Sequence, residues 1–104
     1  MALDEVLDAL GDPTRRRILE QLRVGPAPVG TIASRLPVSR PAVSQHLRVL
    51  ERCALVEHDV VGTRHVYRAA PEGLLALRRW LDEFWEVPLD RFVARAEQEA
   101  RRKR

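Results

Sequence analysis

The segment from Ser39 to Leu50, SRPAVSQHLRVL, constrains the fold more than any other because it predicts a capped helix with two different faces. Ser39 can accept a hydrogen bond from the first backbone N–H groups, and Pro41 is well tolerated in a first helical turn. The apolar residues recur at helical spacing and form a stripe for the core: Val43, Leu47 and Leu50. The polar residues then point outward: Arg40, Ser44, Gln45 and Arg48.

The outward face of this helix carries side chains that are suited to a DNA groove. Arginine pairs with guanine edges or with phosphate, glutamine can bond adenine through two hydrogen bonds, and serine reaches either base or phosphate. A solvated helix face without a partner is the alternative interpretation. The pattern favours a helix that reads DNA.

Length and composition restrict the remaining classes. With 104 residues the chain predicts one domain, 1–104, which can bury a core without metals or disulfides. A single cysteine, Cys53, excludes an internal disulfide and a multi-cysteine zinc site within one chain. The acidic start, MALDEVLDALGD, and the lack of a long apolar run predict a soluble, cytosolic protein with no membrane partner.

The net charge of +3 is unevenly distributed along the chain. Residues 12–54 contain eight arginines and three acids, whereas residues 71–93 contain three arginines and five acids. The basic excess therefore lies with the segment that is predicted to read DNA, as expected if phosphate groups are its partner.

The first part of the chain predicts two helices. Residues 3–10 place four apolar side chains at helical spacing, and Gly11 offers a stop. Asp12 and Pro13 are a capping and first-turn pair that opens the second helix. The arginines at 15–17 cannot all share its apolar face, so we expect some of them to be either solvated or near phosphate.

The middle of the chain predicts a helix-turn-helix followed by a hairpin. Residues 29–53 contain two helical stripes, and the turn from Pro37 to Ser39 is short enough to lay the second helix across the first. Residues 55–69 are rich in Val, Tyr and His, with Gly62 between two extended runs. We therefore expect a β-hairpin, which we call the wing.

Residues 71–96 predict a long amphipathic helix with a wide apolar stripe. Pro88 is expected to break or kink it, because proline removes a backbone hydrogen bond. Residues 97–104 contain almost no apolar side chain and are expected to form a basic tail that frays.

Three segments carry a resemblance to a known family. They are DPTRRRIL at 12–19, SRPAVSQHLRVLERCALV at 39–56 and GTRHVYR at 62–68. With these segments in this order, residues 3–87 resemble the ArsR-type (ArsR/SmtB) winged helix-turn-helix repressors, and in particular members without a metal-sensing site. The resemblance implies a mainly α fold with a small β-hairpin, in the order α-α-α-α-β-β-α with a C-terminal helical extension.

The resemblance also implies a homodimer in which residues 1–11 and 71–96 pack across a two-fold axis and which represses promoters by binding an operator inverted repeat. The composition independently permits this, because the apolar faces of these helices exceed what a small core can cover. The alternative is that the aromatic residues complete the core of the monomer. The expected interface residues are Leu3, Val6, Leu7, Leu10, Leu74, Leu77, Leu81, Phe84 and Trp85.

The resemblance assigns DNA-binding roles residue by residue. The matching positions are Thr31, Ser39, Arg40, Ser44, Gln45, His46, Arg48, Thr63 and Arg64. His46 lies between the core stripe and the exposed face, so a packed histidine and a phosphate contact are both open. Arg64 matches the wing tip, where an arginine could enter a narrow minor groove or simply add solubility.

The metal-sensing patterns of the family are missing from this sequence. Pro28 and Gly30 stand where thiolate sensors carry a pair of cysteines, and residues 72–87 contain no histidine for a site on the fifth helix. His58 and His65 could face each other across the hairpin, but two ligands on an exposed wing fall short of a closed zinc site. We therefore expect no metal and no cofactor.

The residues at the end of the reading helix leave the regulatory signal open. Cys53 could couple oxidation to DNA affinity if Arg52 favoured its thiolate, or it could be a small buried residue. Ala54 stands where the family often uses glycine, so the junction is expected to differ in shape. A redox- or ligand-responsive repressor and a winged-helix protein-interaction module remain alternatives, whereas no set of residues supports an enzyme.

Overall fold

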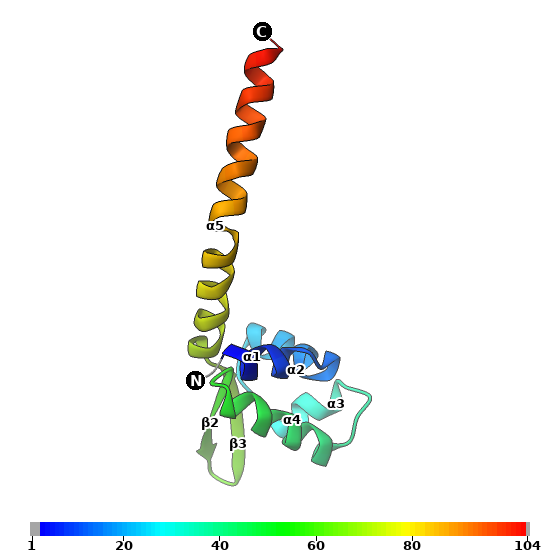
Figure 1. Cartoon of the computed structure of the whole chain (residues 1–104). Coiled ribbons are helices and arrows are strands. Elements are labelled where there is room, and N and C mark those ends of the chain that lie inside the picture. The colour runs from blue at the N-terminus through cyan, green and yellow to red at the C-terminus, as the bar shows by residue number, and fades with distance from the viewer. Residues whose placement is uncertain (1–2, 104) are drawn as a thin grey trace.

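The computed structural model describes residues 3–103, with the side chains of residues 87–89 outside the description. The elements are α1 (Leu3–Leu10), α2 (Pro13–Val24), β1 (Ala27–Pro28), α3 (Val29–Ser34), α4 (Arg40–Arg52), β2 (Val56–Val61), β3 (Arg64–Ala69) and α5 (Pro71–Arg102). The predicted mainly α fold with a hairpin is confirmed (Figure 1).

The sheet contains a short strand that the sequence did not predict. Its order is β1-β3-β2, and β1 pairs antiparallel with β3 through Ala27 opposite Tyr67 and Pro28 opposite Val66. Two residues carry no periodicity, and a proline argues against a strand except at a sheet edge, which is where β1 lies. This strand ties the start of α3 to the wing.

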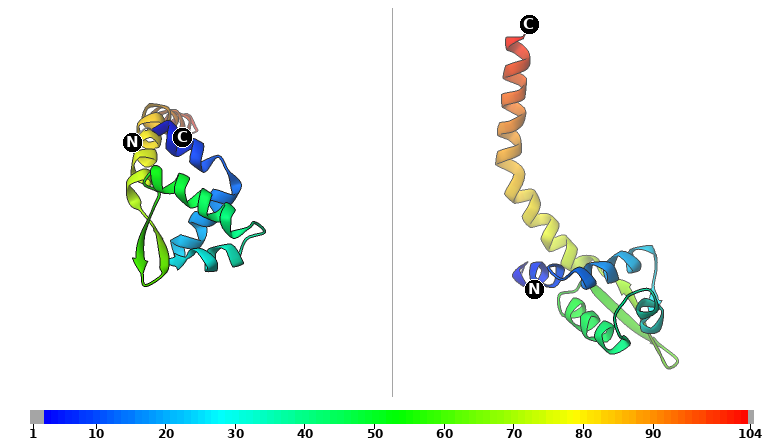
Figure 2. Two further views of the ribbon diagram at one scale, coloured as in Figure 1. Left: turned by 90° about the horizontal axis from the view of Figure 1, so that it is seen from below. Right: turned by 90° about the vertical axis from the view of Figure 1, so that its right-hand side faces the viewer.

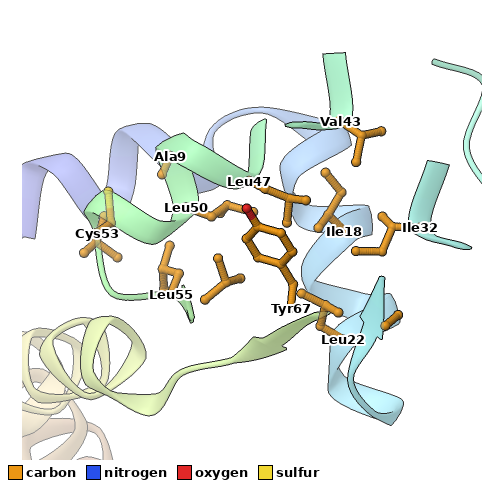
Figure 3. Packing of buried hydrophobic residues seen from close by; sticks show 13 residues of the cluster. Ala9, Ile18, Leu22, Ile32, Val43, Leu47, Leu50, Cys53, Leu55 and Tyr67 are labelled. Carbon is orange, nitrogen blue, oxygen red and sulfur yellow. The ribbon is translucent and has the colours of Figure 1, made fainter. Parts of the chain in front are cut away.

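The core lies where α1, α2, α3, α4 and the base of the wing meet. The predicted stripe of α4 is confirmed, since Val43, Leu47 and Leu50 are completely buried. Figure 3 shows Leu47 facing Ile18 of α2, with the ring of Tyr67 between α4 and the sheet. Burying a large aliphatic side chain contributes about 1.5–3 kcal/mol, so the face of α4 that packs inward is strongly determined.

The end of α1 is held by two of the three arginines at 15–17. Nε of Arg15 donates to the carbonyl oxygen of Ala9 at 2.6 Å, and Nη1 of Arg16 donates to that of Leu10 at 2.7 Å. Carbonyl groups at a helix end have no partner within the helix and attract cations. These two side chains therefore hold the end of α1, whereas Arg17 is exposed.

Asp12 begins α2 as the sequence predicts. Its carboxylate accepts a hydrogen bond from the backbone N–H of Arg15 at 2.9 Å. This hydrogen bond lowers the pKa of the Asp12 carboxyl, and the nearby charges of His46 and Arg15 act in the same direction. The ordinary N-cap geometry thus fixes the turn between α1 and α2.

α4 ends in a Schellman motif that has alanine in place of the usual glycine. The N–H of Leu55 bonds to the carbonyl of Leu50 at 3.0 Å, and that of Ala54 bonds to Glu51 at 3.1 Å. Ala54 has a φ of 54°, in the left-handed region that glycine favours. The junction therefore keeps the hydrogen bonds of the motif, while the Cβ of Ala54 adds strain.

α5 starts directly on this junction because Gly73 allows a close approach. The N–H of Gly73 donates to the carbonyl of Ala54 at 3.0 Å. A Cβ at Gly73 would lie 2.5 Å from the carbonyl oxygen of Cys53 and 2.8 Å from a methyl carbon of Leu55. Any larger residue would push α5 away from the end of α4.

α5 is one continuous helix of 32 residues. Of the two outcomes expected at Pro88, the helix does not break, and Figure 2 shows a bend about halfway along, as expected when one backbone hydrogen bond is lost. Residues 97–102 are helical and do not form a separate tail. The helix projects from the body, so the overall extents are 68 × 27 × 21 Å.

None of the helices in the described part of the chain is long and apolar enough to cross a membrane.

We expect Ala54→Gly to stabilise the protein by about 0.5–1 kcal/mol, because glycine removes the strain of a left-handed alanine. Urea unfolding followed by circular dichroism measures the change. Ala42→Gly, within α4, is the matched control and should destabilise by a similar amount. Destabilisation by both changes would contradict the assigned strain.

Candidate nucleic-acid interface

The predicted DNA-binding elements lie together at one end of the molecule. Figure 1 shows α3, α4 and the turn of the wing on the lower side, while α5 projects from the upper side. Arg40, Gln45 and Arg48 are exposed on α4, and Ser44 is half-buried. The two faces of α4 are thus arranged as predicted, because its core stripe is buried on the opposite side.

The helix-turn-helix connection is built from a serine cap. Oγ of Ser39 accepts a hydrogen bond from the backbone N–H of Ala42 at 3.3 Å, and Pro41 lies in the first turn. The cap replaces a bond that no helical carbonyl can supply. It therefore fixes the position of Arg40 in the first turn of α4.

A hollow of about 380 Å³ separates the start of α3 from the wing tip. A Cβ on Gly30 would lie 3.7 Å from Nη1 of Arg40, so the guanidinium crosses directly over the start of α3. The hollow brings together predicted residues from three elements: Thr31, Arg40, Thr63 and Arg64. Two cations at its walls suit a phosphate backbone.

A second hollow of about 410 Å³ separates α4 from the inner face of the wing. Its polar lining includes the predicted Arg40, Ser44 and Arg48 together with Glu51, His58 and His65. The sequence analysis did not assign Glu51 to this surface. Its spacing along α4, three residues after Arg48 and seven after Ser44, could have placed it there.

The wing ends in a tight turn that exposes two predicted residues. Val61 is opposite Arg64 in the ladder, leaving Gly62 and Thr63 as the turn. Gly62 has a φ of 64° at the first central position, as in a type II′ turn. Thr63 and Arg64 are exposed at the tip, while Arg68 is paired with Glu57 and Asp59 on the outer face.

His46 is packed between α2 and α4. Its Nδ1 lies 3.5 Å from Nη1 of Arg15 and 3.9 Å from Oδ2 of Asp12. Of the two roles left open by the sequence, these contacts favour the packed histidine. Gln45 is exposed and makes no side-chain hydrogen bond within the part of the chain that the structure describes.

His58 and His65 lie close together on the wing, with ring centroids 5.2 Å apart. Nδ1 of His58 is 2.5 Å from a carboxylate oxygen of Glu51. In the described range 3–103, no three His, Cys, Asp or Glu side chains are grouped so that they could hold a metal ion. His58 of this pair is thus engaged with α4, and the expectation of no metal stays a prediction.

The predicted dimer residues fall into three groups by exposure. Leu7, Leu74, Leu81, Phe84 and Trp85 are exposed, and Leu3, Leu10 and Leu77 are half-buried. Val6 is a correction, because its side chain is completely buried in the core of the protomer. The periodicity of α1 indicates its apolar side. It cannot show which residues on that side are covered by α2 and α4 of the same chain.

Several large apolar side chains of α5 are exposed, and three of them contact one another. Trp80 stacks on Phe84 with ring centroids 5.2 Å apart, and Phe84 meets the edge of Trp85 at 5.0 Å. Phe92 and Val93 extend the apolar surface beyond the body of the protein. An apolar surface of this extent on a small chain marks an interface.

Cys53 is buried at the end of α4. Only 4% of its surface is exposed, and its Sγ donates to the carbonyl oxygen of Glu5 at 3.4 Å. Burial raises the pKa of the Cys53 thiol, and the charge of Glu5 raises it further. These contacts argue against the redox alternative, since burial raises the pKa more than the charge of Arg52 lowers it.

Comparison with known proteins places the chain among transcriptional regulators. Residues 10–59 match a family model described as a helix-turn-helix domain. The chain is 56% identical to the HTH-type transcriptional regulator Rv2034 of Mycobacterium tuberculosis over 82 residues, which cover 79% of this chain and 77% of the relative.

Solved structures agree with this comparison. An ArsR-like transcriptional regulator from a Rhodococcus species is 39% identical, with a TM-score of 0.73 and coverage of 94% of this chain and 92% of that one. The homodimeric winged helix-turn-helix DNA-binding domain of a possible ArsR-family regulator from Mycobacterium bovis is 30% identical. Its TM-score is 0.65, with coverage of 85% of this chain and 82% of that one.

We expect Cys53 to react with iodoacetamide about tenfold more slowly than free cysteine at pH 8, because burial disfavours the thiolate. Mass spectrometry of the labelled protein measures the rate. Labelling in urea should restore the rate of free cysteine. Fast labelling of the folded protein would contradict this prediction. If peroxide also abolished DNA binding by the wild type but not by Cys53→Ser, the redox alternative would be supported.

Proposed function

This chain belongs to the ArsR/SmtB family of winged helix-turn-helix transcriptional regulators, and we propose that it acts as a homodimer that represses a promoter by binding an inverted repeat. In this proposal α4 is the recognition helix in the major groove, and the wing tip reaches the adjacent minor groove. One copy of α4 reads each half of the operator.

The observation that carries the proposal is the convergence of Arg40, Arg48 and Arg64 around two connected hollows on one side of the protein. Arg40 lines both hollows and thereby links the wing tip to the inner face of the wing. Each arginine that neutralises a phosphate adds affinity through counterion release, and the affinity falls as salt rises. Base preference then comes from Gln45 and from the arginine that reaches a guanine edge.

The homodimer is supported by the apolar patch on the opposite side. α1 packs against the start of α5, so Leu7 and Leu81 belong to neighbouring elements of one exposed surface. A two-fold axis through this surface would place both α4 helices on the same side of the dimer. Small regulators gain specificity by reading two half-sites in this way.

A ligand-responsive regulator is the second candidate, and one observation favours it. An apolar hollow of about 270 Å³ is lined by Leu10, Leu19, Ala69 and Leu74, with charged side chains from α2 at its rim. It adjoins the proposed dimer surface, because Leu10 and Leu74 line it. A small apolar molecule bound there would act at the edge of the dimer.

A fluorescence-anisotropy titration tests the proposed function. The full chain is titrated against a duplex from its own upstream intergenic DNA and against a scrambled duplex, each with and without chelator and reductant. Tight, selective binding that neither additive changes supports a metal-independent regulator. Equally weak binding to both duplexes would support the interaction-module alternative.

We expect Gln45→Ala to weaken binding to the upstream intergenic duplex by about 1–3 kcal/mol, because one bidentate base contact is lost. Binding to scrambled DNA should change little. The same anisotropy assay measures both, with Arg79→Ala, which changes an exposed arginine of α5 away from the hollows, as the unaffected control. Equal losses on both duplexes would show that Gln45 does not read a base.

We expect Leu81→Glu and Trp85→Glu each to produce monomers, because a charge would be buried in the interface. Operator affinity should fall about 100-fold, since the two half-sites would no longer be bound together. Light scattering measures the mass. Leu75→Glu is the control, because Leu75 is an exposed leucine of α5 that is not among the expected interface residues, and this variant should remain dimeric. A dimer that survives the first two changes would overturn the proposed interface.

A further inference from the structure

The recognition helix and the wing are joined by one side-chain pair. Glu51 lies in the last turn of α4, His58 lies on β2, and Nδ1 of His58 is 2.5 Å from Oε1 of Glu51. The carboxylate can only accept, so the imidazole N–H donates. Within residues 3–103 this is the only side-chain hydrogen bond that links α4 to the hairpin.

The register of the hairpin explains why His58 faces α4. His58 is directly opposite Tyr67, whose ring is buried in the core, and the two rings are 4.8 Å apart. Side chains alternate between faces along a strand, so His65 lies on this inner face too. The acidic side chains Glu57 and Asp59 are on the outer face, where both pair with Arg68.

The outer half of the wing has little else to fix its direction. β1 supports β3 only at Val66 and Tyr67, so beyond these residues the hairpin is a two-stranded ribbon. Such a ribbon is marginally stable alone and can bend. Arg64 is at its tip, and its position relative to α4 therefore depends on contacts near the base of the ribbon.

The same pair controls charge on the DNA side. Glu51 shares its hollow with Arg40 and Arg48, so an unpaired carboxylate there would oppose a phosphate approaching these arginines. The remaining titratable groups that face His58 across this hollow are His65 and Tyr67. Burial raises the pKa of the Tyr67 hydroxyl, and the charge of Glu51 adds to this effect.

We propose that Glu51 and His58 are a positioning pair that holds the wing against the recognition helix, so that Arg64 and Arg48 engage one DNA site together. The proposal rests on the proposed function. The imidazole N–H of His58 holds the wing through its hydrogen bond to the Glu51 carboxylate.

A double-mutant cycle tests the pair. Glu51→Ala, His58→Ala and the double variant are titrated by anisotropy against an operator duplex that includes the flanks reached by the wing, and against one trimmed to the sites of α4. On the long duplex at pH 6 each single variant should bind about tenfold more weakly than the wild type, and the double variant no more weakly than either. On the trimmed duplex all proteins should bind alike.

Two controls separate positioning from general effects of charge. Glu57→Ala removes the same charge from the outer face of β2 and should not weaken binding on either duplex. His65→Ala removes the neighbouring imidazole, which makes no hydrogen bond to Glu51 among the described residues, and should weaken binding on the long duplex much less than His58→Ala does. Thermal melting by circular dichroism confirms that each variant is folded.

The outcomes distinguish this inference from the function on which it rests. Failure of the wild type to prefer the operator over scrambled DNA would overturn the proposed function. A wild type that prefers its operator, with single variants that match it on the long duplex, would overturn only the positioning pair. Additive losses in the double variant would do the same, because they would show that the two side chains act separately.

Discussion

The burial of one stripe of α4 determines both the core and the surface that this protein presents. Val43, Leu47 and Leu50 are completely enclosed, and a helix that buries these positions must expose Arg40, Gln45 and Arg48. Rotating α4 would cost several large apolar contacts, each worth about 1.5–3 kcal/mol. The orientation of the proposed DNA-reading side chains is therefore held by the core and needs no contact on the surface itself.

Much of this arrangement could be predicted because it depends on local patterns. The period of α4, the Asp12 and Ser39 caps and the glycine at the wing turn each act within a few residues, and the structure confirms them. The family resemblance gave the order of elements, which the solved relatives share.

The remaining features depend on how separate elements are placed in space. Arg15 and Arg16 cap α1 because α2 turns back beside it, and no pattern within either helix shows this. Val6 is buried because α1 lies against the core, whereas its periodicity alone cannot tell a core residue from an interface residue. The contact between Glu51 and His58 forms only if one face of α4 meets one face of β2. The sequence indicates the faces of each element separately but not which two faces meet.

The junction after α4 connects the two functional ends of the molecule. Ala54 reverses the chain in a left-handed conformation, and Gly73 brings the first turn of α5 onto the carbonyl groups of that reversal. Because no Cβ fits at Gly73, the angle between α4 and the start of α5 is fixed by backbone contact rather than by flexible side chains. If α5 forms the dimer, this angle sets the separation of the two recognition helices and hence the spacing of the half-sites that they can read. The wing is attached to the same junction through β2, so the dimer surface, the recognition helix and the wing all take their positions from a few residues around Ala54.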